Sequence, residues 1–76
     1  MKYILAMSNT WDGLALEVFE TKEDLVTYLL DEDWELISTV DWVDLESYTH
    51  VSAKYVAVKI DSLGRTTDAY LRVVMG

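Results

Sequence analysis

The chain has 76 residues, with 14 acidic against 6 basic side chains, a net charge of -8, and neither cysteine nor proline. This length allows one small domain, so we expect a single domain over residues 1–76. The absence of cysteine excludes a disulfide scaffold, a thiolate nucleophile and a cysteine-ligated metal. An apolar share of 51% and an aromatic share of 12% favour a packed core over a disordered acidic tail.

The first predicted elements are two strands joined by a tight turn. Residues 2–8 form an apolar run typical of a buried strand, and residues 14–20 show the two-residue apolar period of a second one. Asp12 and Gly13 lie between them and indicate a turn, because glycine tolerates positive φ and aspartate bonds to nearby backbone. We therefore expect a hairpin with Trp11 exposed near its tip.

A helix is predicted next, over about residues 22–33. Thr21 is placed to cap its N-terminus, and Asp24 follows three residues later, where a carboxylate suits the start of a helix. The spacing of Leu25, Tyr28 and Leu29 supplies an apolar stripe on one side.

Two interpretations remain open for the segment after this helix. Leu30, Trp34 and Ile37 continue a helical stripe, whereas an extended chain would place Trp34 on one face with later apolar residues. We favour an extended stretch over residues 34–40, followed by a turn or short helical turn over residues 41–47.

The last third predicts a second hairpin. Residues 55–61 and 69–75 alternate like strands, and Gly64 between them suits a left-handed turn position. Residues 48–54 would extend the first of these strands, with a bulge near Ala53 or Lys54 where the apolar phase shifts. The predicted fold class is α+β: an antiparallel sheet of four to five strands in the order β-β-α-(β)-β-β, with one helix packed on a face.

The negative charge is concentrated in the middle of the chain. Residues 20–46 carry a net charge of -9, whereas residues 1–19 are nearly neutral and residues 47–76 carry a net charge of +2. One basic residue, Lys22, lies in this acidic segment. Its carboxylates are Glu20, Glu23, Asp24, Asp31, Glu32, Asp33, Glu35, Asp41, Asp44 and Glu46.

The residue types speak against catalysis, metal binding and cofactors. The single histidine, His50, stands apart from any nucleophile motif, and three isolated glycines form no phosphate-binding loop. Asp31 and Asp33 begin like an EF-hand loop, but the glycine that such a loop needs is missing. We expect neither enzyme activity nor a metal or cofactor, and the net charge disfavours direct binding to nucleic acid or anionic membranes.

Recognition through a surface remains as the favoured function. A net charge of -9 matches about 15 Å of duplex DNA, because the duplex carries one charge per ~1.7 Å of its axis. A helix and the segment after it, spanning about 20 to 30 Å, would space carboxylates in a comparable way. Of the aromatic residues, we expect Trp34 to pack in the core and treat Trp11 and Trp42 as candidate partner-binding residues, together with the ten carboxylates of the acidic segment.

The layout resembles that of small acidic phage-encoded inhibitor proteins, including anti-CRISPR proteins. The resemblance rests on the hairpin start MKYILAMSNTWDG, on the acidic stretches ETKEDLVTYLLDEDWE and DWVDLE, and on the lack of cysteine and targeting signals. It implies a stoichiometric inhibitor in the host cytoplasm that covers a basic surface of a CRISPR effector or another nucleic-acid enzyme.

A second interpretation stays open beside the inhibitor. The chain would then be a structural or regulatory interaction module, such as a subunit partner or a self-associating β-domain. Its acidity would serve solubility in that case. The oligomeric state is open, and a dimer is one of the expected alternatives.

Overall fold

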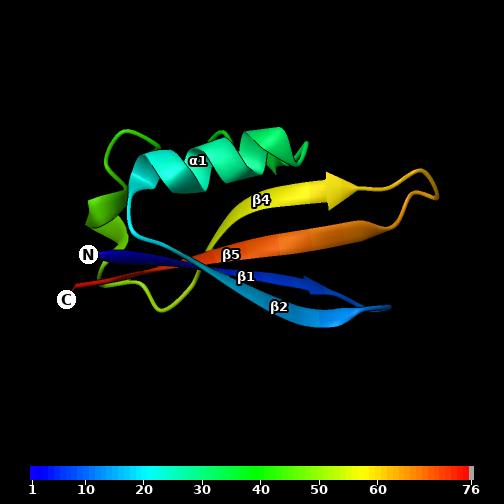
Figure 1. Ribbon diagram of the computed structural model, residues 1–76, viewed down its shortest axis with the longest axis horizontal. Helices are drawn as coiled ribbons and strands as arrows, with labels where there is room; N and C mark the ends of the chain where they lie inside the picture. The colour runs from blue at the N-terminus through cyan, green and yellow to red at the C-terminus, as the bar shows by residue number, and fades with distance from the viewer. Residues whose placement is uncertain (76) are drawn as a thin grey trace.

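Five antiparallel strands and one α-helix make up the part of the chain that the computed structural model describes, residues 1–75 (Figure 1). The strand order across the sheet is β2-β1-β5-β4-β3. The α+β class and the predicted element order are therefore confirmed. The elements along the chain are β1 (Lys2–Asn9), β2 (Gly13–Phe19), α1 (Lys22–Asp31), β3 (Glu35–Leu36), the short 3-10 helix η1 (Leu45–Tyr48), β4 (Lys54–Ile60) and β5 (Thr66–Val74).

The helix covers one face of the sheet, and the two hairpin turns project from one end of it (Figure 1). The start of β1 and the end of β5 lie together at the opposite end of the sheet. Gly13 and Gly64 adopt φ of 83° and 79°, so both predicted glycine turn positions are confirmed. No helix in residues 1–75 is long and apolar enough to cross a membrane.

The start of α1 follows the predicted cap. The Thr21 Oγ1 accepts a hydrogen bond from the Asp24 backbone N–H at 3.1 Å, which satisfies one of the unpaired donors of the first turn. Glu23 and Asp24 place two carboxylates in that turn, where they meet the positive end of the helix dipole.

The end of α1 is a Schellman turn built without glycine. The Trp34 N–H donates to the Leu29 carbonyl at 2.9 Å, and the Asp33 N–H donates to the Leu30 carbonyl at 3.3 Å. Asp33 takes the left-handed conformation that this turn requires, with φ of 61°. The turn reverses the chain and brings Trp34 under the helix, where it is buried.

The segment between α1 and β4 departs most from prediction. The extended stretch expected over residues 34–40 is limited to Glu35 and Leu36, because the chain turns where the Val40 N–H donates to the Ile37 carbonyl. Residues 48–54 do not extend the next strand, since η1 occupies their start and β4 begins at Lys54. The sheet has a bulge, but it lies between Tyr55 and Ala57 rather than near Ala53 or Lys54.

The core lies between α1 and the sheet. Leu5 and Leu71 at the sheet centre are fully or almost fully buried, as are Leu25 and Leu29 on the helix. The bulge turns both Val56 and Ala57 inward, so β4 contributes two consecutive buried residues. The remaining core residues are Tyr3, Met7, Trp34, Val40, Leu45, Ala69 and Val73.

The opposite side of the sheet carries a second, uncovered apolar surface. Residues that alternate with the core positions point to this side, and the strand register places them in adjacent rows. We call this side the open face. Its apolar centre consists of Leu14, Leu16, Val18, Ile4, Ala6 and Tyr70.

Candidate protein-binding surfaces

All ten carboxylates of the acidic segment are exposed, but the fold divides most of them between the two ends of α1. The first group lies at the N-terminal end of the helix. The Lys22 Nζ donates to the Val43 carbonyl at 2.9 Å, which ties the first helical turn to the loop that follows β3. We call this group the N-terminal acidic cluster; it consists of Glu20, Glu23, Asp24, Asp41, Asp44 and Glu46.

Backbone and electrostatic contacts show how this cluster is assembled. The Asp41 Oδ1 accepts hydrogen bonds from the backbone N–H groups of Val43 and Asp44 at 3.2 and 3.1 Å, which holds the loop in a tight turn. Burial raises the pKa of the Tyr3 hydroxyl, and the charges of Glu46 and Glu23 raise this pKa further. Two carboxylates that are 23 residues apart in sequence therefore act on one hydroxyl at this end of the molecule.

The second group lies at the other end of the helix. We call it the C-terminal acidic cluster; it consists of Asp31, Glu32 and Asp33. Glu35 follows them in sequence, but its pairing with Val58 points it to the open face. The last turn of α1 has no basic residue, so the charges of this cluster meet the negative end of the helix dipole uncompensated. Since α1 has 10 residues, the two clusters are about 15 Å apart along its axis.

Glu17 belongs beside the C-terminal acidic cluster, although the sequence places it outside the acidic segment. Burial raises the pKa of Tyr28, and the charges of Glu17 and then Glu32 add to this effect. Glu17 is on β2, and its side of the strand faces α1 through the pairing with Leu5. The pairing of β2 with β1 places Glu17 near Tyr28, and no local pattern in the sequence predicts this position.

The basic residues of the chain leave the acidic clusters largely unneutralised. Within residues 1–75, the ion pairs are Lys2 with Glu20, exposed and 4.0 Å apart, and Arg65 with Asp61 at 2.8 Å. Lys54, Lys59 and Arg65 instead lie over aromatic rings, those of Tyr48, Trp34 and Trp11, at 5.4, 5.8 and 4.7 Å from the ring centroids. Arg65 also pairs with Asp61, which lies outside the acidic segment, so none of these three cations forms an ion pair with any of the described carboxylates of the acidic clusters.

The three tryptophans have different surroundings. Trp34 is 7% exposed and belongs to the core, as expected. Trp42 is half-buried against the core, and its Nε1 donates to the Ile37 carbonyl at 3.0 Å. Trp11 is 42% exposed at the first hairpin turn, as expected, with the Arg65 guanidinium over its ring. The fold thus places Trp42 with the N-terminal acidic cluster and Trp11 at the hairpin end, so the two do not form one aromatic site.

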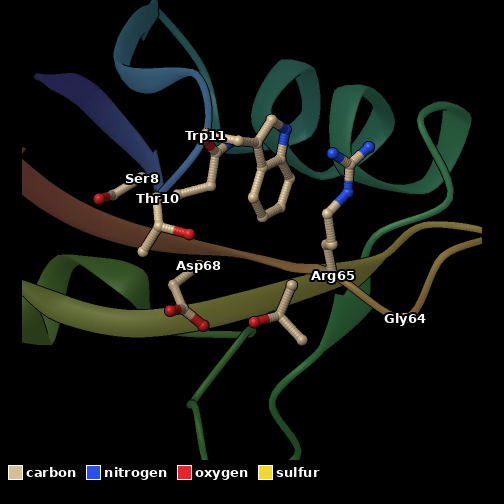
Figure 2. Close-up of a pocket in the computed structure, with 8 residues that line it drawn as sticks. Ser8, Thr10, Trp11, Gly64, Arg65 and Asp68 are labelled. Atoms are coloured by element: carbon tan, nitrogen blue, oxygen red, sulfur yellow. The ribbon is translucent and has the colours of Figure 1, made fainter.

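A cleft of about 460 Å³ separates the two hairpin turns. Figure 2 shows Trp11 beside Arg65 on one side of the cleft and Ser8 and Asp68 on another. Asp68 is the carboxylate of this lining, and its Oδ1 accepts a hydrogen bond from the Tyr55 hydroxyl at 3.1 Å. The hydroxyl groups in the cleft have no histidine beside them, because His50 is exposed in the loop after η1.

In the described part of the chain, no group of three or more histidine, aspartate or glutamate side chains is placed to hold a metal ion. Comparisons with protein-family models, with curated proteins and with solved structures returned no match.

Proposed function

We propose that the protein is a non-catalytic inhibitor that binds a basic, nucleic-acid-binding surface of another protein through its acidic clusters. The observation that carries this proposal is the exposure of all ten carboxylates together with the stacking of three cations on aromatic rings. The resulting field is directed outward and attracts a cationic groove. As in anti-CRISPR proteins and other phage counter-defence proteins, inhibition would follow from occupying that groove.

The spacing of the charges supports mimicry of a nucleic-acid backbone. About 15 Å of helix separates the two clusters, and duplex DNA carries roughly nine phosphate charges over the same length. The acidic segment carries a net charge of -9. Between the clusters, the outer side of α1 exposes Thr27 and Leu30, so the charges form two groups rather than a continuous row.

Reversal of charge in one cluster at a time tests this proposal. In the first variant, Asp31 and Glu32 become lysine; in the second, Glu23 and Asp44 do. Asp33 stays unchanged in both variants because its backbone has a positive φ, which lysine tolerates poorly. Each variant changes the net charge by the same amount, so the pair separates a local contact from a general effect of charge.

The assay is affinity capture from host lysate, followed by competition with duplex DNA for each captured protein. We expect wild-type protein to capture a nucleic-acid-binding protein and to release it as salt rises, because exposed charges are screened. We also expect at least one charge-reversed variant to lose this capture while remaining folded by circular dichroism. If the amount of captured protein changes neither with salt nor in either charge-reversed variant, the inhibitor proposal is refuted.

One observation favours a second candidate, a structural or regulatory interaction module. The open face exposes large apolar side chains in adjacent rows, and contiguous patches of this kind mark interaction sites. In this case Leu16→Lys would abolish binding to a partner and the charge reversals would not. The two candidates therefore give opposite results in the same capture assay.

A further inference from the structure

The open face exposes several large apolar side chains together. Leu14, Leu16 and Val18 are 66%, 62% and 54% exposed, and Tyr70 on β5 is 39% exposed. Single exposed leucines are ordinary, but the three apolar residues of β2 form one row, and Ile4 and Ala6 of β1 join this row to Tyr70. The edge strand β2 adds to this surface, since it has one charged residue, Glu17, and lacks the lysine or proline that protects many sheet edges.

The size of the open face fits a reversible dimer. Four long strands at ~4.8 Å spacing and about seven residues at ~3.4 Å give roughly 450 Å² per copy. Two copies would cover about 900 Å² in total, close to the ~1,000 Å² at which specific interfaces begin. The area suits a dimer that forms and dissociates with concentration rather than a permanent one.

The charges of the open face are balanced and separated along the strands. Lys2 and Arg72 point to this side near the chain ends, and Glu35 and Asp68 point to it nearer the hairpin turns. The two positive and two negative charges cancel, although the whole chain has a net charge of -8. Asp68 and Arg72 are four residues apart on β5, a distance of about 13 Å along the strand.

This arrangement is complementary to itself. If a second copy faces the first with its strands reversed, its negative end meets the positive end of the first copy. A twofold axis along the row of Leu16, Ala6 and Tyr70 then packs that row against its own copy. The same rotation brings Leu14 over Val18 and Arg72 over Asp68 of the second copy, so every contact occurs twice.

We propose that the protein forms a twofold-symmetric dimer in which two open faces pack against each other with antiparallel strands. The two sheets become the layers of a β-sandwich, a common packing for apolar sheet faces. Both helices and all four acidic clusters remain on the outside, so the strongest negative charges stay apart. This inference rests on the open face and not on the acidic clusters.

Sedimentation equilibrium over a range of protein concentrations tests the dimer. We expect a reversible monomer–dimer equilibrium for the wild type, and we expect Leu16→Lys to lower the association constant on the order of tenfold or more. The matched control is Leu30→Lys, which makes the same substitution on α1 at similar exposure, 57% against 62%. This control should dimerise like the wild type.

A charge exchange tests the orientation and does not depend on Leu16. Arg72→Asp alone and Asp68→Arg alone place like charges opposite each other, so each variant should dimerise less than the wild type. A mixture of the two variants restores both pairs of opposite charges and should form a heterodimer, detected by labelling one variant. Lys59→Asp changes the net charge as Arg72→Asp does, but its pairing with Thr67 places it on the α1 side of the sheet, so this variant should leave the dimer intact.

Three results would overturn the inference. The first is a wild type that stays monomeric at every concentration. The second is equal association of folded Leu16→Lys and Leu30→Lys, which would place the contact elsewhere. The third is a mixture of the charge variants that associates no better than either alone, and this result decides the matter if Leu16→Lys fails to fold. None of these results bears on capture of a basic partner, so failure of the dimer and failure of the inhibitor proposal are distinguishable.

Discussion

Asp33→Gly is predicted to stabilise the fold, because Asp33 ends α1 in a conformation that suits glycine better. Its φ of 61° lies in the left-handed region, which costs an ordinary L-residue about 1–2 kcal/mol and aspartate somewhat less. Glycine has no Cβ atom and therefore avoids this cost. The substitution also removes a carboxylate from the negative end of the helix dipole, worth about 0.3–1 kcal/mol.

One opposing term reduces the gain. Glycine loses more backbone freedom on folding, which costs about 0.5–1 kcal/mol. The sum is a stabilisation of about 0.5–1 kcal/mol in the free energy of unfolding. For a domain of this size, that corresponds to a rise in Tm of roughly 2–8 °C. Thermal and urea unfolding followed by circular dichroism measure both quantities.

Two control substitutions separate the terms. Asp33→Asn keeps a residue that tolerates the left-handed region and removes the charge, so its gain measures the dipole contribution. Asp33→Ala removes the charge but puts a less tolerant residue at the same φ, so it should be less stable than the asparagine variant. If the glycine variant is less stable than the alanine variant, the proposed conformational cost at Asp33 is refuted.

Three further predictions concern the core, the helix cap and the second turn. Leu25→Ala should lower the free energy of unfolding by about 2–5 kcal/mol, because this side chain is fully buried, and urea unfolding at an unchanged midpoint would contradict it. Thr21→Ala should cost about 1 kcal/mol in the same assay by removing the acceptor of the Asp24 N–H, whereas Thr21→Ser should cost little. The hydrogen bond from the Arg65 backbone N–H is the largest of the effects that lower the pKa of Asp61. The stabilisation from Asp61 is therefore present above its unfolded pKa and lost as the pH falls through the folded pKa, and an NMR titration showing an ordinary pKa would contradict this.

Local signals predicted the parts of the fold that local physics decides. The turn at Gly13 and the cap at Thr21 each depend on a few neighbouring residues, and both are confirmed. The helix was predicted to end near Asp33, and it ends at Asp31, but the left-handed conformation of Asp33 was not predicted, because it is imposed by the turn rather than by a glycine. Likewise, the bulge after Tyr55 depends on how β4 packs in the sheet, so the apolar phase alone misplaced it by two or three residues.

The candidate surfaces show a similar division. The charge pattern of the sequence indicates one acidic segment, whereas the folded helix separates its carboxylates into two clusters. The alternation of β2 predicts a strand without saying which side is buried. The register with β1 decides this, since Leu16 pairs with Ala6 on the open face and Glu17 pairs with Leu5 on the side of the helix. The large uncovered surface is therefore a property of strand pairing.

The two proposed surfaces lie on opposite sides of the sheet, and this arrangement has a measurable consequence if both proposals hold. A dimer through the open faces would present two sets of acidic clusters outward, so it could engage two basic sites at once. We expect wild-type protein to dissociate more slowly from a densely immobilised basic partner than from a sparse one. Leu16→Lys should retain the affinity for sparse partner and lose the dependence on density. If the wild type and Leu16→Lys depend equally on the density of the partner, dimerisation does not contribute to binding and this prediction is wrong.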